Sequence, residues 1–378
     1  MNVLGLYSKR PEYFCSGFPI YQKKAKGCEI TDISNKKYID MSHIGFSACV
    51  LGYSNPIINA MAKKAINDGS FSLLNSFNDK INADNFIKIH KWADKVRFTR
   101  SGGEACQVAA EIAKANTNRK GILQCGYSGW KLQNENHRKF TYNDIESFYQ
   151  VINKNIGIVI VEAIRYEEPS PEWIELLKEI NKKYILIIDE ITSGFRFANG
   201  GIHEKWGLRP AMAVFGKSMS NGFPCGAVLM RGDIEEGNKF ISSTYWTDNV
   251  TPAAITMSMM LHRIYRPHYL AKIGKEIKKV IVGCADYYQL PIKINEVDHI
   301  IKFTFDHEKT NILETLYTQL MLKEKFLATN IIYPSYAHKI KHLKEFARAI
   351  YKVFFIIKKH INDPERILIG NEKKHKIT

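Results

Sequence analysis

The sequence lacks long hydrophobic runs and paired cysteines. Its 378 residues hold no apolar stretch of about 18 or more, so we expect no helix that spans a membrane. The seven cysteines are scattered, odd in number and free of any CxxC pair, which argues against a disulfide framework and a cysteine zinc site. The segment from Met1 to Tyr7 is too short, and too polar at its flanks, for a signal peptide. Together these absences predict a cytoplasmic protein with free thiols.

Motifs typical of metal sites and of nucleic-acid binding are also missing. The twelve histidines show neither an HExxH motif nor a paired ligand spacing, so we expect no metal. The net charge is +16 and lysines become dense at 358–360 and 373–376, but no RRM, KH or zinc-finger pattern accompanies them. We interpret this charge as a solvated surface, with no nucleic-acid or membrane partner. The alternative is a basic protein that binds nucleic acid or membranes in a salt-dependent way.

The middle of the sequence alternates short apolar runs with helical patterns. Apolar runs without polar alternation are typical of parallel strands that are covered by helices on both faces. We expect strands at 96–99, 121–125, 156–162, 184–189, 211–215 and 225–230, and helices at 104–116 and 171–183. This alternation predicts an α/β domain with a central, mostly parallel sheet flanked by helices.

The two ends of the chain follow a different pattern. Residues 28–32 and 37–40 flank a turn and predict a β-hairpin. From about Pro252 onward the sequence is mostly helical and amphipathic. We therefore predict a small α+β domain made from both chain ends beside the large domain. The predicted boundaries give residues 1–45 and 256–378 to the small domain and residues 46–255 to the large one.

Two of the expected strands end in residues suited to binding a ligand. Ligands of open α/β sheets bind at the carboxyl ends of the strands. Residues 101–105 (SGGEA) join a strand to a helix. Such a turn either binds a phosphate with its backbone N–H groups or is a connecting turn with no binding role. Asp189 ends another strand, and its carboxylate needs a partner once it is buried. A protonated heterocyclic nitrogen is one such partner, and a helix cap or a salt bridge is the alternative.

A lysine and a tyrosine follow two further strands. Lys217 comes after an apolar run and is flanked by small residues, so it is either a Schiff-base lysine or a surface lysine of a loop. Tyr127 lies between Gly126 and Gly129, where its ring can stack on a flat cofactor or pack in the core. The order of glycine turn, aromatic ring, strand-end acid and lysine is more informative than any one of these motifs.

At this point the sequence resembles the class III aminotransferases of pyridoxal-phosphate (PLP) fold type I, especially the glutamate-1-semialdehyde aminomutase-like branch. Residues 187–196 (IIDEITSGFR) look like the family's DEVxTGFR signature, and residues 101–105 look like its SGTEA segment. Residues 215–224 (FGKSMSNGFP) are similar to its lysine segment, and residues 29–54 to its N-terminal YIDM…LGHxHP region. The resemblance covers residues 17–260 well and the C-terminal part loosely.

The resemblance implies a role for each of these residues. Lys217 would carry PLP as a Schiff base and move the α-proton of the substrate, and Asp189 would bind the pyridine nitrogen. Tyr127 and Ile191 would pack on the two faces of the cofactor ring. The other cofactor contacts implied are Ser101, Gly102, Gly103 and Glu162, together with Thr244, which would reach the phosphate from the partner subunit. The resemblance therefore implies a homodimer with an interfacial active site.

Three further residues are candidates for contacts with substrate. Arg196 and Arg165 could bind a substrate carboxylate in a bidentate way, although a structural salt bridge is the alternative for each. His43 could line the substrate pocket or be a packed structural histidine.

The sequence departs from the family pattern at four places. Ala163 replaces the proline of a Glu-Pro pair, and Gly103 replaces a threonine that could contact the phosphate. Residues 130–142 are short where aminomutase-like enzymes have a long loop, and residues 246–252 replace a shorter run. The last two departures fall where substrate is held, so they bear on the substrate rather than on the cofactor chemistry.

These observations predict a PLP-dependent aminotransferase that moves an amino group from a donor, glutamate, to a carbonyl acceptor. Because the segment after Tyr127 is short, the acceptor could be a bulky sugar or keto-acid intermediate of surface-polysaccharide synthesis. The alternative with the same cofactor is an aminomutase of the glutamate-1-semialdehyde kind, which needs no separate donor.

Overall fold

The computed structural model describes residues 9–134, 137–237 and 240–374 and divides the chain into two compact units. One unit is Pro56–Pro267, and the other combines Met1–Asn55 with His268–Thr378. A smaller unit made from both chain ends, as the sequence predicted, is therefore present. No helix in the described part of the chain is both long enough and apolar enough to cross a bilayer.

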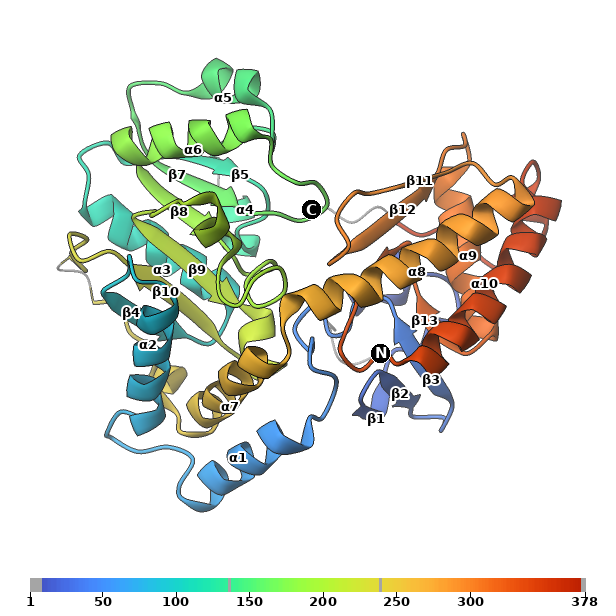
Figure 1. Ribbon diagram of the computed structural model, residues 1–378, viewed down its shortest axis with the longest axis horizontal. Helices are drawn as coiled ribbons and strands as arrows, with labels where there is room; N and C mark the ends of the chain where they lie inside the picture. Colours follow the sequence, from blue (N-terminus) through green and yellow to red (C-terminus); the bar gives the residue numbers. More distant parts are fainter. Residues whose placement is uncertain (1–8, 135–136, 238–239, 375–378) are drawn as a thin grey trace. The chain divides into compact units, whose positions relative to one another are not determined.

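The Pro56–Pro267 unit is built around a seven-stranded sheet (Figure 1). The strand order is β4-β10-β9-β8-β7-β5-β6, and only β10 runs against its neighbours. The predicted central, mostly parallel sheet is confirmed. Its strands are β4 (Lys95–Thr99), β5 (Gly121–Cys125), β6 (Arg138–Lys139), β7 (Ile156–Glu162), β8 (Ile185–Asp189), β9 (Met212–Gly216) and β10 (Gly226–Met230).

Helices cover this sheet, and one of them supplies much of the core. Ile158 and Ile160 of β7 belong to the apolar cluster that α3 forms with one face of the sheet, while Val159 between them points to the other face. Both faces are thus buried, which explains why the strand sequences are continuous apolar runs. The helices are α1 (Pro56–Asn67), α2 (Phe77–Ile89), α3 (Gly102–Ala115), α4 (Trp130–Asn134), α5 (Ile145–Val151), α6 (Pro171–Lys183) and α7 (Val250–Ile264).

The direction of the strands gathers the predicted site residues at one edge of the sheet. β4, β5, β7, β8 and β9 run in the same direction, so their carboxyl ends lie along one edge. Glu162 and Asp189 end neighbouring strands and are register partners. The segments that follow these strand ends are 100–103, 126–129 and 190–193, together with the turn that begins at Lys217.

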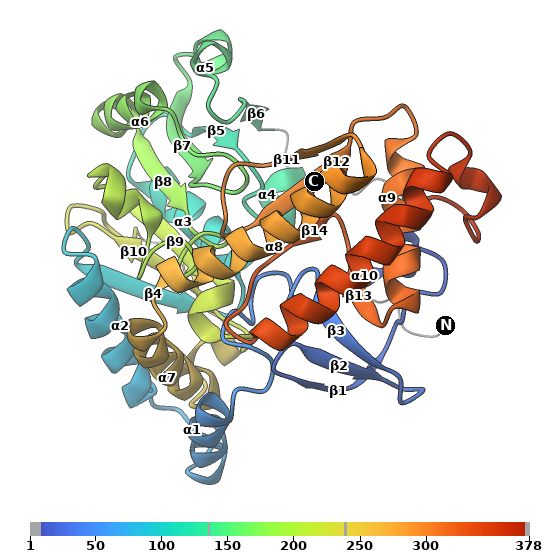
Figure 2. The same cartoon turned by 45° about the vertical axis from the view of Figure 1, so that its right-hand side comes forward.

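The unit made from the chain ends contains two small sheets and three long helices (Figure 2). The predicted hairpin is present, since β2 (Glu29–Asp32) pairs antiparallel with β3 (Lys37–Met41). The helices share an apolar core with the strands that lie between them in the sequence. The remaining elements are β1 (Gln22–Lys26), α8 (Pro267–Tyr288), β11 (Ile292–Ile294), β12 (Ile301–Phe305), α9 (Thr310–Lys323), β13 (Phe326–Ala328), β14 (Ile331–Ile332) and α10 (Ile340–Lys359).

The C-terminal part differs from the mostly helical chain that the sequence predicted. Four short strands, β11 to β14, lie between its helices. Each has only two to five residues, too few to show a clear alternation of apolar and polar side chains. Their pairing partners, rather than their own sequences, make them strands.

Candidate active site

Lys217 lies in a strained turn directly after β9. Its φ is 44°, in the left-handed region that side chains other than glycine rarely adopt. The turn is held from α7, because a ring nitrogen of the buried His262 lies 2.8 Å from the carbonyl oxygen of Ser218. The amine of Lys217 donates a hydrogen bond to Thr192 Oγ1 at 2.8 Å. Strained non-glycine residues held in this way cluster at functional sites.

The environment of Lys217 favours loss of its charge. Burial, and after it the nearby guanidinium of Arg165, lowers the pKa of the amine to about 8, although the carboxylates of Glu162 and Asp189 act in the opposite direction. A lysine with such a pKa carries a neutral, nucleophilic amine in a substantial fraction of molecules near neutral pH. Lys217 is therefore suited to attack a carbonyl carbon and to accept a proton.

Asp189 is a buried carboxyl group with few partners. It is 4% exposed, and its Oδ1 accepts a hydrogen bond from the backbone N–H of Ile191 at 2.9 Å. Its Oδ2 lies 3.6 Å from the thiol of Cys106, a weak donor on the first turn of α3. Burial, and after it the neighbouring Glu162, raises the pKa of Asp189 to about 7. Among the described residues no cation forms a direct ion pair with this carboxyl group, and a protonated heterocyclic nitrogen would supply such a partner.

The 100–103 turn presents the start of α3 to the same edge of the sheet. Ser101 caps the helix, since its Oγ accepts a hydrogen bond from the N–H of Glu104 at 3.2 Å. A side chain at Gly102 would meet Ile191 at 2.7 Å, so the turn and Ile191 need glycine there to pack together. The free N–H groups and the dipole of this helix start favour an anion such as a phosphate.

Tyr127 and Glu162 face each other across two neighbouring strand ends. Glu162 Oε1 pairs with the guanidinium of Arg165 at 2.7 Å, and Oε2 accepts from the N–H of Tyr127 at 3.4 Å. Gly126 has a φ of 87°, and a side chain there would meet Glu162 at 2.5 Å. The Tyr127 side chain is 37% exposed, which leaves its ring accessible for stacking. The buried hydroxyl of Ser128 has no hydrogen-bond partner among the described residues.

This geometry does not decide the predicted roles of three further residues. Thr244 lies in an exposed 3-10 turn, Thr244–Thr247. Arg196 is fully buried, which favours the structural alternative over a direct contact with substrate. His43 belongs to the other unit, where it packs near the rings of Phe46 and Tyr333 and lines a cavity of about 360 Å³. The roles of these three residues stay predictions.

One histidine cluster has the spacing of a metal site but uses its nitrogens for hydrogen bonds. His90, His203 and Glu204 bring their ligand atoms together. His90 Nε2 accepts from the N–H of Gly201 at 2.9 Å, and His203 Nε2 accepts from the Trp92 indole at 3.1 Å. His203 Nδ1 lies 2.7 Å from Glu190. These hydrogen bonds fasten the 190–203 segment, which follows Asp189 in the sequence.

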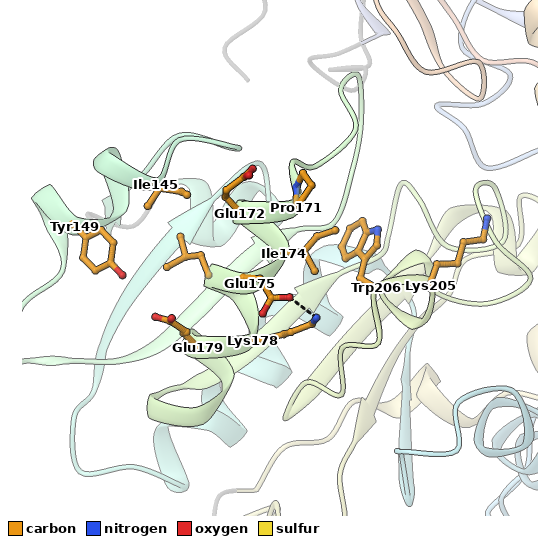
Figure 3. Close-up of a pocket in the computed structure, with 11 residues that line it drawn as sticks. Ile145, Tyr149, Pro171, Glu172, Ile174, Glu175, Lys178, Glu179, Lys205 and Trp206 are labelled. Carbon is orange, nitrogen blue, oxygen red and sulfur yellow. Dashed lines mark hydrogen bonds and ion pairs between the residues drawn. The ribbon is translucent and has the colours of Figure 1, made fainter.

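A further groove lies on the outside of α6 (Figure 3). It measures about 640 Å³, and Glu175 pairs with Lys178 on its floor. None of the residues predicted for the site is among those that line it. The chemistry at the strand ends therefore does not depend on this groove.

The chain belongs to the class-III aminotransferase family. The sequence model of that family matches residues 15–131 and 125–283, which is more than half of the chain. A 3-aminobutyryl-CoA aminotransferase of Cloacimonas acidaminovorans (strain Evry) is 25% identical over 358 residues, covering 84% of this chain and 85% of that protein. A glutamate-1-semialdehyde 2,1-aminomutase of Methanocaldococcus jannaschii is 27% identical over 341 residues, covering 79% of each.

The fold agrees with solved structures of PLP enzymes. The PLP internal aldimine form of the FumI protein of Sphingopyxis sp. MTA144 superimposes with a TM-score of 0.88 at 21% sequence identity, covering 96% of this chain and 95% of that one. The predicted PLP fold type I is thus confirmed, and the chain is a PLP-dependent aminotransferase. The site fits this cofactor: among the described residues, no cation pairs directly with Asp189, the N–H groups of Gly102 and Gly103 at the start of α3 have no acceptor, and the Ser128 hydroxyl has no partner.

The sequence did not single out two residues that the site contains. Thr192 contacts the amine of Lys217, and Cys106 contacts the carboxyl group of Asp189. Thr192 occupies the variable position of the DEVxTGFR-like segment, and Cys106 follows directly on the SGGEA segment. The sequence could have suggested these two residues only because they lie in or beside recognised motifs. Their contacts with Lys217 and Asp189 depend on the conformation of the turns, which the sequence pattern does not predict.

Gly103 offers a direct test of the predicted phosphate position. A Cβ added there has Gly129 as its nearest neighbour at 3.8 Å, so a side chain fits. We expect Gly103→Thr to bind PLP about tenfold more tightly or better, because a hydroxyl would donate a hydrogen bond to a charged phosphate. Titration of the apoenzyme with PLP measures this. Gly103→Ala is the control, and equal affinity of both variants would place the phosphate away from Gly103.

Proposed function

We propose that this enzyme moves an amino group from glutamate to a carbonyl acceptor, with Lys217 and Asp189 as the catalytic residues. The observation that carries the proposal is that a buried lysine of lowered pKa and a buried acid of raised pKa, which form no ion pair among the described residues, lie at adjacent strand ends. PLP supplies a sink for the electrons of the broken Cα–H bond when it is bound. Lys217 would hold the cofactor covalently and, once released, carry the α-proton of the substrate.

The other residues would orient the cofactor. Asp189 would keep a proton on the ring nitrogen, and Tyr127 and Ile191 would lie against the two faces of the ring. Ser101, Gly102 and Gly103 would bind the phosphate through the capped start of α3, and Glu162 would hold the segment of Tyr127 in place. Each role agrees with the strand end or turn from which the side chain comes.

The acceptor we propose is a keto acid or keto sugar, such as an intermediate of surface-polysaccharide synthesis. Its support is the short segment 130–142, whose described residues include α4 and the two-residue strand β6. A long gating loop is thus replaced by a short connection that leaves room for a larger acceptor. The second candidate is an aminomutase, which the similarity to glutamate-1-semialdehyde 2,1-aminomutases favours.

We also propose that the active site is completed by a second copy of the chain. Apolar side chains of the 71–77 segment are exposed: Leu73 is 101% exposed and Phe77 72% exposed. The ring of Phe71, in the same segment, lies 5.7 Å from that of Tyr245. Exposed apolar patches of this kind mark interfaces between subunits. Thr244, the neighbour of Tyr245, would then reach the phosphate of the partner subunit.

An absorption spectrum with and without glutamate tests the proposed donor. We expect a visible band from covalently held PLP, and its loss on addition of glutamate as the cofactor takes up the amino group. Glutarate, which has both carboxylates but no amine, is the control and should leave the band unchanged. A band that glutamate does not alter would overturn glutamate as donor and favour the aminomutase. Sedimentation of the same preparation reports whether the chain is a dimer.

A further inference from the structure

Thr192 is the hydrogen-bond acceptor of the Lys217 amine. The distance from Lys217 Nζ to Thr192 Oγ1 is 2.8 Å, and Thr192 is 2% exposed. Among the described residues, this is the hydrogen bond that the structure gives the amine. We propose that Thr192 is a positioning residue that holds the released amine of Lys217 in place while it carries the α-proton of the substrate. This inference rests on the proposed role of Lys217.

The hydroxyl of Thr192 is fixed in space by the turn that also presents Asp189. The backbone N–H of Ile191 donates to Asp189 Oδ1 at 2.9 Å, which anchors the start of the turn. Ile191 is held in turn by its close packing against Gly102. Threonine itself is branched at Cβ, so its side chain has few rotamers. A long, flexible lysine is thereby tethered to a rigid point beside the ring-binding acid.

The need for such a tether follows from the proton transfer. Lys217 Nζ would take the proton from the α-carbon of the substrate, become an ammonium group, and then give that proton to the carbon that was the aldehyde carbon of PLP. An ammonium group in a buried site requires an acceptor, and a freely rotating side chain would spend little time in the reactive geometry. The Thr192 hydroxyl meets both requirements through one contact.

The charged and titratable groups around the amine are otherwise fixed. Asp189 and Glu162 favour the ammonium form of Lys217, whereas burial, Arg165 and Arg196 disfavour it. Cys106 lies on the far side of Asp189 and has a strongly raised pKa, so it stays a neutral thiol. Removing the Thr192 hydroxyl takes away an acceptor that stabilises the ammonium form. The pKa of the free Lys217 amine should therefore fall further below its ordinary value.

Thr192→Val tests the inference, because valine keeps the shape of threonine and lacks the hydroxyl. We expect kcat to fall about tenfold or more with KM for the donor unchanged, since a hydrogen bond to a charged group is lost at the proton-transfer step. Independently of turnover, the rate at which the apoenzyme captures PLP covalently should show a lower pH midpoint than in wild type. Thr192→Ser should restore both values.

Controls separate this role from a merely structural one. Thr256→Val removes another buried threonine hydroxyl, one that bonds to Asn82 in α2, and should leave the pH midpoint unchanged. Thr192→Ala is a second variant without the hydroxyl if valine disturbs folding. A pH midpoint equal to that of wild type, together with a kcat within about twofold of wild type, would overturn the inference. If glutamate proves not to be the donor, the PLP-capture midpoint still decides the role of Thr192.

Discussion

Lys217→Ala is expected to lose the visible band of covalently held PLP and to lose transamination. The variant has no amine to bond to the cofactor, so PLP should be removed by gel filtration where wild type retains it. Loss of the proton-carrying group alone should lower the rate by at least about 10²-fold. The measurements are the absorption spectrum after gel filtration and the single-turnover rate with glutamate.

A control for Lys217→Ala must remove a lysine from the same sheet without touching the site. Lys95 serves, because its amine donates to the carbonyl oxygens of Gly232 and Ile234 at the start of β4. Lys95→Ala should lower the thermal stability slightly and keep the band. An added small amine should restore part of the rate of Lys217→Ala by entering the space left by the side chain. A Lys217→Ala protein that stays yellow after gel filtration would assign the covalent link to another lysine.

The sequence predicts the sheet and its acidic and basic strand ends because they depend on patterns along the chain. Asp189 ends an apolar run and Lys217 follows one, so the parallel sheet places both at one edge. The contact between Lys217 and Thr192 depends instead on a left-handed residue and a turn whose conformation leaves no periodic signal. Thr244 is a different case, since its predicted role requires a second copy of the chain.

The second expected result concerns the acid that would face the cofactor nitrogen. Asp189→Asn keeps the shape of the side chain but cannot balance a positive charge on the ring. We expect the rate to fall by about 10²- to 10⁴-fold, which corresponds to the roughly 3–5 kcal/mol for breaking a buried charge pair. PLP should still bind covalently, because Lys217 is intact. The spectrum and the single-turnover rate therefore separate this variant from Lys217→Ala.

The pH dependence of thermal stability tests the role of Asp189 independently of the reaction rate. Burial raises the pKa of Asp189 from 3.8 to about 7. Unfolding releases the carboxylate into water, so this group destabilises the folded apoenzyme progressively as pH rises between these two values, and the penalty is complete above about 7.

A ring cation bound to Asp189 removes the penalty, so PLP should stabilise wild type more at pH 8 than at pH 5. Asp189→Asn, which does not ionise, should show a smaller increase in PLP stabilisation from pH 5 to pH 8 than wild type. Glu190→Gln is the control: its carboxylate bonds to His203 instead, so its loss should lower stability and leave the pH dependence of the PLP effect intact. Equal stabilisation of wild type at the two pH values would mean that no cofactor cation rests against Asp189.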